Sequence, residues 1–245
     1  ILKGVTIQDA HSNVGGAIVI DGANPSLENC IFKNNIAIGG AAVASLNMSY
    51  PSIRNCDFVG NRFKDGGSSG AGISCTTWDI GPTGILITDC RFTDNGSGPD
   101  DINGGFGSAI FIFGIMETQI TNCVFNNNLN QNSGTLVIDT IGESPVINQC
   151  TFAGNSSSVN GVLYCSNPNN PFLISNSIFA FNEGSDWISL YGTTEVSIGC
   201  SNVFGNTTGD WIECIADQAN SITNFSLDPK FCDAVNGDLA LEATS

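Results

Sequence analysis

Residues 29–35 read NCIFKNN, and the same pattern returns as NCDFVGN (55–61), DCRFTDN (89–95), NCVFNNN (122–128) and QCTFAGN (149–155). Each copy places phenylalanine two residues after cysteine and asparagine three residues after phenylalanine. The copies recur every 26–34 residues. A period of this length is typical of a solenoid, in which each repeat forms one turn that stacks on the turn before it.

The repeat continues beyond the five cysteine copies. Ser177 in NSIFAFN and Asn202 in SNVFGN are expected to take the place of the cysteine. An aliphatic residue lies three places before most of these positions. The resulting columns are cysteine-like (Cys30, Cys56, Cys90, Cys123, Cys150, Ser177, Asn202), aromatic (Phe32, Phe58, Phe92, Phe125, Phe152, Phe179, Phe204), aliphatic (Leu27, Ile53, Ile87, Ile120, Ile147, Ile174) and amide (Asn35, Asn61, Asn95, Asn128, Asn155, Asn182).

A second strand is expected in each repeat, usually after a glycine. Examples are GGAIVID (15–21), GSAIFIF (107–113) and SGTLVID (133–139). Residues of a strand point alternately to its two faces. The residues predicted to point inward are Ile18, Ile20, Ile110, Ile112, Leu136, Ile138, Leu163 and Cys165, and those predicted to point outward include Tyr164, Ser189 and Glu213.

Short strands, glycine-rich corners and the lack of a helical period predict an all-β fold. We expect one right-handed parallel β-helix of about eight coils over residues 1–245, with an irregular coil or cap over 207–245. The first ten residues already fit the motif, with Leu2, Val5, Ile7 and Ala10 in the four columns. We therefore expect the chain to be an excerpt of a longer protein. Stacking of copies end to end, or a loop folded over the first coil, would also explain this beginning.

The composition limits the partners. The chain has 7 Lys and Arg against 23 Asp and Glu, a formal charge of −16, and 41% of its residues are hydrophobic. So acidic a surface disfavours nucleic acid and anionic membranes as partners. No apolar run approaches the length of a membrane span. These features fit a protein that works outside the cell or at its surface.

The cysteines of the column are predicted to be small buried residues. Free cysteine is among the most buried residue types, and no CxxC pair suggests zinc. A disulfide is more plausible among Cys200, Cys214 and Cys232, which lie outside the column. Cys75 remains open, because it falls where other repeats carry Asp21, Ser45 and Asp139.

The rhythm of ITNCVFNNN (120–128) resembles right-handed parallel β-helix repeat proteins of the pectate-lyase-like superfamily. The tail GDWIECIADQ (209–218) with NFSLDPKFCDAVNGDLAL (224–241) resembles the closing segment of large secreted or surface-anchored bacterial proteins of this kind. The resemblance covers the whole chain and implies the fold. It implies little about activity, because this fold serves lyases, hydrolases, adhesins and tailspikes.

Within that resemblance, a lyase would use a basic side chain to abstract a proton next to a uronate carboxylate, with calcium to neutralise the carboxylate. The candidates for the base are Arg62, Lys64 and Arg91. Hydrolases of the polygalacturonase type resemble one another in an NTD motif, a paired DD and a GHG, and only the DD is present, at Asp100 and Asp101. His11 is interpreted as a solvated loop residue.

The longest repeats contain loops at 62–70, 76–84 and 94–107. These loops carry Trp78 beside Arg62, Asp65 and Asp79, and a tryptophan beside charged groups is a common way to bind a sugar. The alternative is that these loops are ordinary solvated turns. Trp187 and Trp211, in DWIS and DWIE, are predicted to pack under the C-terminal segment, the alternative being an outward pair near Tyr191.

Residues 94–103 also supply several oxygen ligands of the kind that calcium prefers. The predicted ligands are Asp94, Asp100, Asp101 and Asn103, without the spacing of an EF-hand.

The sequence therefore predicts a binding or structural module at the cell surface or outside the cell, which contacts a polysaccharide or a surface protein through loops of coils 2–4. The alternatives are a calcium-assisted polysaccharide lyase and a filament subunit that stacks head to tail.

Overall fold

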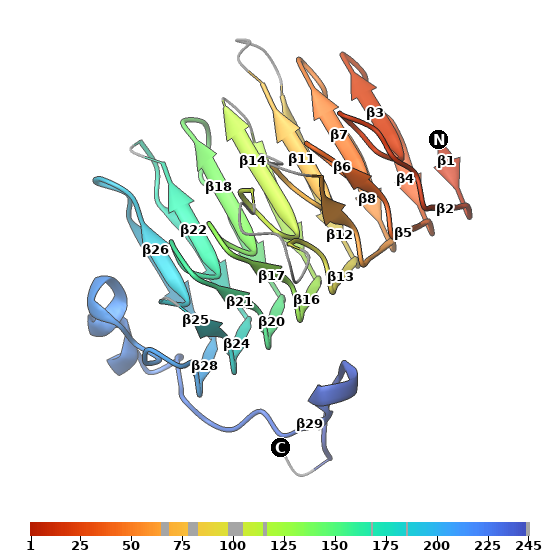
Figure 1. Ribbon diagram of the computed structural model, residues 1–245. Coiled ribbons are helices and arrows are strands. Elements are labelled where there is room, and N and C mark those ends of the chain that lie inside the picture. Colours follow the sequence, from red (N-terminus) through yellow and green to blue (C-terminus); the bar gives the residue numbers. More distant parts are fainter. Residues whose placement is uncertain are drawn as a thin grey trace.

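The computed structural model describes residues 1–64, 69–77, 83–97, 105–114, 117–167, 169–184 and 186–243. It is all-β, with 48% strand and 4% helix, and forms a parallel β-solenoid of about seven turns. Its strands lie in register from one coil to the next, so the sheets run the length of the solenoid (Figure 1). The predicted parallel β-helix is thereby confirmed.

Three long parallel sheets form the walls. The first contains β1 (Leu2–Lys3), β4 (Ser26–Glu28), β8 (Ser52–Arg54), β12 (Gly84–Thr88), β15 (Glu117–Thr121), β19 (Val146–Asn148), β23 (Phe172–Ser175) and β27 (Val196–Gly199). The second contains β2 (Thr6–Gln8), β5 (Ile31–Lys33), β9 (Asp57–Val59), β13 (Arg91–Thr93), β16 (Val124–Asn126), β20 (Thr151–Ala153), β24 (Ile178–Ala180) and β28 (Asn202–Phe204). The third contains β3 (Ile18–Asp21), β7 (Val43–Leu46), β11 (Ile73–Thr76), β14 (Ile110–Gly114), β18 (Leu136–Thr140), β22 (Leu163–Ser166) and β26 (Ile188–Leu190).

Two-residue strands lie between the second and third sheets in most coils. They pair as β6 (Ile36–Ala37) with β10 (Arg62–Phe63), and as β17 (Leu129–Asn130), β21 (Ser156–Ser157) and β25 (Glu183–Gly184). After the last coil come the 3₁₀ helix η1 (Glu213–Asn220), strand β29 (Phe231–Asp233), the short 3₁₀ helix η2 (Ala234–Asn236) and strand β30 (Asp238–Leu241).

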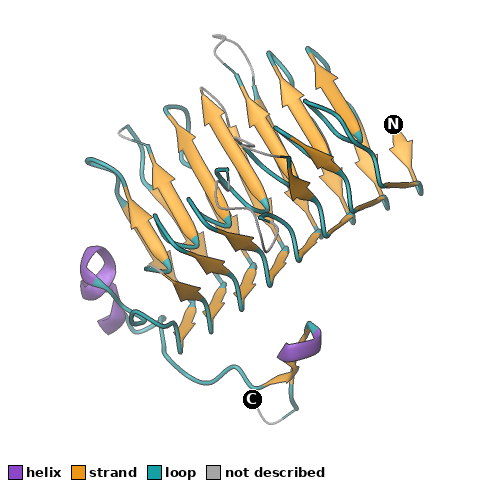
Figure 2. Ribbon diagram, in the orientation of Figure 1, coloured by secondary structure: helices purple, strands orange, loops and turns teal. Residues whose placement is uncertain are grey.

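The solenoid has about seven turns where the sequence predicted about eight. The eighth coil contributes β27 and β28 but no strand to the third sheet. The chain instead enters η1 at the place where Glu213 was expected on a strand. Figure 2 shows the helical segments at the C-terminal end of the molecule.

The register places like residue over like. In the second sheet the aromatic column pairs Ile7 with Phe32 and continues through Phe58, Phe92, Phe125, Phe152 and Phe179. Neighbouring rings are stacked, with centroids 4.4–5.0 Å apart. These side chains are fully buried and form the centre of the hydrophobic core.

In the last coil, at β28, the register differs by one residue from the alignment predicted from the sequence. Val203, and not Phe204, pairs with Phe179, while Phe204 pairs with Ala180. Consequently Ser201, and not Asn202, takes the place of the cysteine. The sequence alignment followed the aromatic residue, whereas the register follows Asn206, which continues the asparagine column.

Two corners with left-handed backbone conformation explain why Asn, Asp or Gly precedes the cysteine and the asparagine of most repeats. The residue before the cysteine and the residue before the asparagine both have positive φ, as at Asn29 (53°) and Asn34 (54°). Asn, Asp and Gly tolerate this conformation best. The same corners are occupied by Asn122 and Asn127, and by Gly60 and Gly154 in other coils. The motif is thus a cysteine and a strand of three residues between two tight corners.

The buried asparagines form a continuous ladder between coils. In each, Nδ2 donates to Oδ1 of the asparagine in the next coil at 2.9–3.1 Å, and the backbone N–H donates to the same Oδ1. The second hydrogen of Nδ2 reaches a backbone carbonyl of the preceding coil, as from Asn61 to Phe32. The ladder runs from Asn35 to Asn206 and ends on the carboxylate of Asp210, which accepts both bonds.

The cysteine column also makes hydrogen bonds, which goes beyond its predicted role as apolar filling. Each thiol donates to the carbonyl of the residue two places before it at 3.2–3.3 Å. The hydroxyl of Ser177 makes the same bond at 2.7 Å and accepts from the N–H of Cys150. Ser201 repeats this arrangement, and its own N–H donates to Oδ1 of Asn224.

Cys75 belongs to the inward column of the third sheet. It pairs with Ser45 and Ile112, and it is buried. The sequence alignment had also placed it with Asp21 and Asp139, which instead share a row with Thr76 and face outward. The ten cysteines, all of them in the described part of the chain, form no disulfide; Cys200, Cys214 and Cys232 are exposed and the other seven are buried.

The C-terminal segment covers the end of the solenoid. Ile215 of η1 is fully buried against the core, and the side chain of Gln218 bonds to the backbone of Val196 and Ile198 as a further strand would. Trp187 is buried, packs on Phe179 and donates to the carbonyl of Asp210. Trp211 lies partly buried against the core, so both tryptophans pack under this segment as predicted.

The tail then turns back along the outside of the second sheet. Phe231 packs on Ala153 and Ala180. Its ring lies edge-to-face with that of Phe181, and the two ring centroids are 6.3 Å apart. Within the described residues, no helix has the length and apolar character needed to cross a lipid bilayer.

Because the asparagine ladder is buried, we expect the loss of a single amide from it to destabilise the protein strongly. Replacing Asn128 with Ala removes the acceptor of two bonds from Asn95 and the donor to the carbonyl of Phe92. Because these groups are buried, we expect the free energy of unfolding to fall by about 3 kcal/mol or more, measured by urea titration. Asn127→Gly is the matched control, because Asn127 is exposed at a left-handed corner; an equal loss in the control would contradict the ladder.

The hydrogen bonds of the cysteine column lead to a prediction for serine variants. Replacing cysteine by serine should lower the free energy of unfolding only slightly where the thiol donates a hydrogen bond, and more where it does not. Cys90→Ser keeps a donor to the carbonyl of Thr88, and we expect a loss below about 1 kcal/mol. Cys165 is equally buried but lies in the third sheet, where the structure assigns its thiol no hydrogen bond among the described residues. Cys165→Ser should therefore cost about 2 kcal/mol. Equal losses in the two variants, by the same titration, would show that both cysteines are only apolar filling.

Candidate functional site

An aromatic surface lies on the outer side of the third sheet. On β14, Ile110 and Ile112 point inward and are fully buried, so Phe111 and Phe113 point outward. Tyr164 of β22 shares the row of Phe111, with Val137 of β18 between them. Phe106 precedes β14 and Tyr191 follows β26, and these two are 47% and 67% exposed. We call these five residues, Phe106, Phe111, Phe113, Tyr164 and Tyr191, the aromatic face.

The rings of the aromatic face lie close to one another. The centroids of Phe111 and Phe113 are 6.2 Å apart with nearly parallel planes, and those of Phe106 and Phe111 are 6.0 Å apart with tilted planes. Tyr164 and Tyr191 are 6.5 Å apart. Since the coils of a parallel sheet are spaced about 4.8 Å apart, the face extends along the solenoid axis over four coils.

A pocket of about 260 Å³ opens within this face. We call it the aromatic pocket. It is lined by Phe106, Phe111, Phe113, Ser133, Val137, Asp139, Asn160 and Tyr164. Four of these side chains are aromatic, whereas one carboxylate, one amide and two hydroxyls, that of Tyr164 included, supply the polar groups. The pocket is therefore an apolar hollow with a few polar contacts, which is the usual composition of a ligand site.

The charge in the aromatic pocket is negative. Burial and the neighbouring carboxylate of Asp139 raise the pKa of Tyr164 above its ordinary value, so its hydroxyl remains protonated and can donate a hydrogen bond. The strands of the third sheet contain neither Lys nor Arg over their described ranges. The seven basic residues lie on the first and second sheets, at β10 and just after it, and in the tail.

The predicted catalytic bases do not form a group. Arg62 is half-buried on β10 and donates to the carbonyl of Ser97. Lys64 donates to Oδ1 of Asn13 in the first coil. Arg91 lies on the outer side of the second sheet and pairs with Asp57 at 2.8 Å. The structure assigns each of these side chains a structural contact, and Arg91 is on a different sheet from Arg62.

The other predicted loop residues are only partly described. Trp78, Asp79 and Asp65, predicted to bind a sugar, lie outside the described residues. So do Asp100, Asp101 and Asn103, which were predicted as calcium ligands. Asp94 is described and lies exposed at a left-handed corner with φ of 56°. Among the described ranges, no three His, Cys, Asp or Glu side chains are grouped as a metal site requires.

A tyrosine and a glutamate form a further titratable pair on the first sheet. The hydroxyl of Tyr50 donates to Oε2 of Glu117 at 2.5 Å. Burial and this contact raise the pKa of Tyr50 to about 12. Tyr50 therefore stays protonated at neutral pH with its proton donated to Glu117, so it is not a base.

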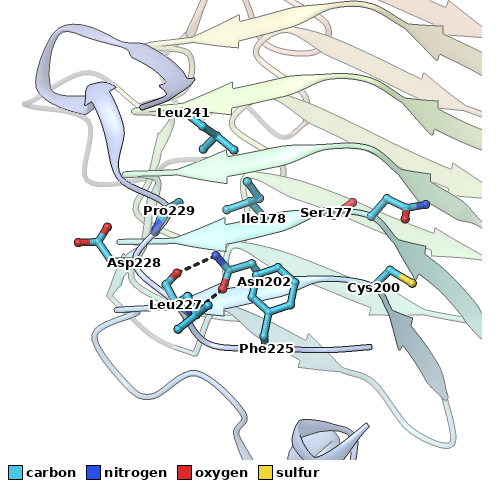
Figure 3. Close-up of a pocket in the computed structure, with 10 residues that line it drawn as sticks. Ser177, Ile178, Cys200, Asn202, Phe225, Leu227, Asp228, Pro229 and Leu241 are labelled. Carbon is cyan, nitrogen blue, oxygen red and sulfur yellow. Dashed lines mark hydrogen bonds between the residues drawn. The ribbon is translucent and has the colours of Figure 1, made fainter. Parts of the chain in front are cut away.

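A second pocket, of about 480 Å³, lies between the tail and the second sheet (Figure 3). Its walls are mainly apolar, from Ile178, Leu227, Pro229 and Leu241. The amide of Asn202 donates to the carbonyl of Leu227 and accepts from its N–H. The amide of Asn202 thus fastens the tail to the sheet, whereas the aromatic pocket contains the carboxylate of Asp139, which forms no salt bridge within the described residues. We therefore consider the aromatic face the stronger candidate.

The aromatic face was not predicted from the sequence. The signal was present in IFIFG (110–114), where aliphatic inward residues alternate with phenylalanine, and Tyr164 was correctly predicted to face outward. Phe106 and Tyr191 lie outside the strands, so only the fold shows that they extend the same surface.

No protein-family model matches the chain, and searches of curated proteins and of solved structures likewise found no match.

The pocket geometry predicts a measurable titration. Asp139→Asn should lower the pKa of Tyr164 while leaving it above the ordinary tyrosine value of about 10, because burial acts in addition to the carboxylate. The ultraviolet absorbance of tyrosinate, compared with Tyr164→Phe, assigns the transition. Since the folded-state pKa is raised, this contribution to stability is complete below about pH 10 and is lost as the pH rises through the folded-state pKa. An unchanged Tyr164 titration in Asp139→Asn would contradict the contact.

Proposed function

We propose that this chain is a glycan-binding module that works outside the cell or at its surface, and that the aromatic face is its binding surface. The observation that supports this proposal is the group of partly exposed rings on one sheet, with Asp139, Asn160 and Ser133 around the pocket. Aromatic rings contact the apolar faces of sugars, and hydroxyl, amide and carboxylate groups bond to their hydroxyls.

The arrangement suits an extended chain of sugars. The rings come from the coils of β14, β22 and β26, with Val137 of β18 between them, so a glycan laid along the solenoid axis would meet them in turn. Strands joined by full hydrogen-bond ladders keep the rings in place without a ligand, which lowers the entropy cost of binding. The proposal moves the binding surface from the predicted loops of coils 2–4 to the third sheet of coils 4–7.

The charge of the face favours neutral or cationic glycans. Asp139 lies in the pocket and no strand of this sheet carries a basic residue, so a polyuronate would be repelled. A lyase needs a base within reach of the proton that it abstracts, and the described basic residues are dispersed. The lyase alternative is therefore disfavoured, and membership of the pectate-lyase-like superfamily stays a proposal that concerns ancestry of the fold, not activity.

Head-to-tail stacking is also disfavoured as the main function. The amide of Gln218 and the buried Ile215 occupy the last coil at the C-terminal end. A copy added there would have to displace η1 first, so a filament would require the loss of this cap.

The proposal predicts retention on neutral polysaccharides. We expect affinity electrophoresis in glucans, mannans and xylans to retard the protein with at least one of them, and polyuronates to retard it less. The double variant Tyr164→Ala, Tyr191→Ala should bind roughly tenfold more weakly, since aromatic anchors contribute strongly to binding.

Val19→Ala is the matched control, because Val19 is 50% exposed on the same sheet but away from the rings. Preferential retardation by polyuronates, release of an unsaturated product from them, or unchanged binding by the double variant would refute the proposal.

A further inference from the structure

We infer that the aromatic pocket is a binding site for an ammonium group, such as that of an amino sugar or of a choline substituent. The inference deepens the proposed function and rests on it only for the polymer that carries this group. The observation behind it is that four aromatic side chains and one carboxylate, Asp139, line the same small hollow.

The rings are close enough to act together on one cation. A cation over an aromatic face is attracted when it lies within about 6 Å of the ring centroid. The centroids of Phe106 and Phe111 are 6.0 Å apart, and those of Phe111 and Phe113 are 6.2 Å apart. A small cation beside Phe111 at the mouth of the pocket can therefore also lie close to a neighbouring ring, that of Phe106 or of Phe113. Groups of aromatic rings are a recurring way to bind quaternary ammonium ligands.

Tyr164 completes the pocket on the side of β22. Its ring lines the hollow, and Val137 of the strand between β14 and β22 forms the floor and is buried. The pocket volume of about 260 Å³ suits a head group better than a complete drug-sized ligand, for which sites of about 300–1,000 Å³ are usual.

Asp139 supplies the charge that makes a cation preferable to a neutral group. It lies half-buried on β18, beside Tyr164, whose pKa its charge helps to raise. Within the described residues Asp139 forms no salt bridge, and the two ion pairs, Lys3 with Glu28 and Arg91 with Asp57, are on the other two sheets. A carboxylate on an apolar surface without a basic partner on its own sheet attracts an external cation.

The negative charge of the whole protein also favours the binding of a cation. The chain carries a formal charge of −16, which raises the local concentration of cations at its surface. Attraction by the whole surface does not depend on ligand shape, whereas attraction by the pocket does. A comparison of ligands with equal shape and different charge, and of variants with equal shape and different charge, separates the two effects.

The test is a titration of the full chain with choline and with its neutral isostere 3,3-dimethylbutan-1-ol, followed by ligand-observed NMR or calorimetry. We expect choline to bind saturably at one site and roughly tenfold more tightly than the isostere. Asp139→Asn, which keeps the side-chain shape, should weaken choline roughly tenfold, and Tyr164→Leu should weaken it as well. Val19→Ala should leave choline binding unchanged, and circular dichroism should show that all variants are folded.

Equal affinity for choline and the isostere would overturn the inference, because it would mean that the pocket is only apolar. No saturable binding, or no loss in Asp139→Asn, would also overturn it. A second arm compares glucosamine with glucose, and preference for glucosamine over choline would identify a primary ammonium group as the natural ligand. Choline binding without retention on any polysaccharide would refute the proposed function alone, whereas retention on neutral polysaccharides without choline binding would refute this inference alone.

Discussion

The fold depends on a ladder of buried asparagine side chains that joins every coil to the next. From Asn61 on, each amide in the ladder accepts two bonds from the coil before it, donates one to a carbonyl of that coil and donates one onward, so the bonds fix both the stacking and the register. A slip by one residue would remove all of these bonds and would turn the phenylalanine column outward. Asp210 ends the ladder with a carboxylate, Asn224 ends the column of thiols and hydroxyls, and Gln218 covers the edge of the first sheet. The C-terminal segment therefore gives these three edges a polar partner.

The same register positions the candidate site. Because the inward residues of the third sheet are fixed by the core, the outward residues are fixed too, and the rings of β14 and β22 lie two strands apart with Val137 between them. The sheet provides the spacing of the rings, and Asp139 provides the charge. Phe106 and Tyr191 extend the surface from the segments that flank the strands. A rigid wall of this kind can bind a long ligand without moving a loop.

Much of the fold could be predicted from the sequence, because the constant spacing within each repeat shows which residues stack on one another. The columns of Cys30, Phe32 and Asn35 recur at constant internal spacing, and their counterparts stack as expected. The prediction failed at two places: Ser201 replaces cysteine without an aromatic residue two places later, and Cys75 was aligned with Asp21 and Asp139, whose row contains Thr76 instead. The role of the thiols as donors could not be read from sequence, since cysteine suits both apolar filling and hydrogen bonding. The site was harder to predict, because the charged loops carry the residue types usual in binding sites, whereas the aromatic face combines residues from three coils whose proximity only the stacking reveals.

The most direct test of the stacked core is native-state labelling of the cysteines, read residue by residue by mass spectrometry. Burial raises the pKa of Cys123 and Cys165 well above the ordinary thiol value, and a neighbouring thiol and burial raise that of Cys56, so these groups are protonated as well as inaccessible. The account predicts that a thiol reagent near neutral pH promptly modifies Cys200, Cys214 and Cys232, and modifies the seven buried cysteines only after unfolding. Prompt modification of Cys30, Cys56, Cys90, Cys123 and Cys150 in the folded protein would contradict it.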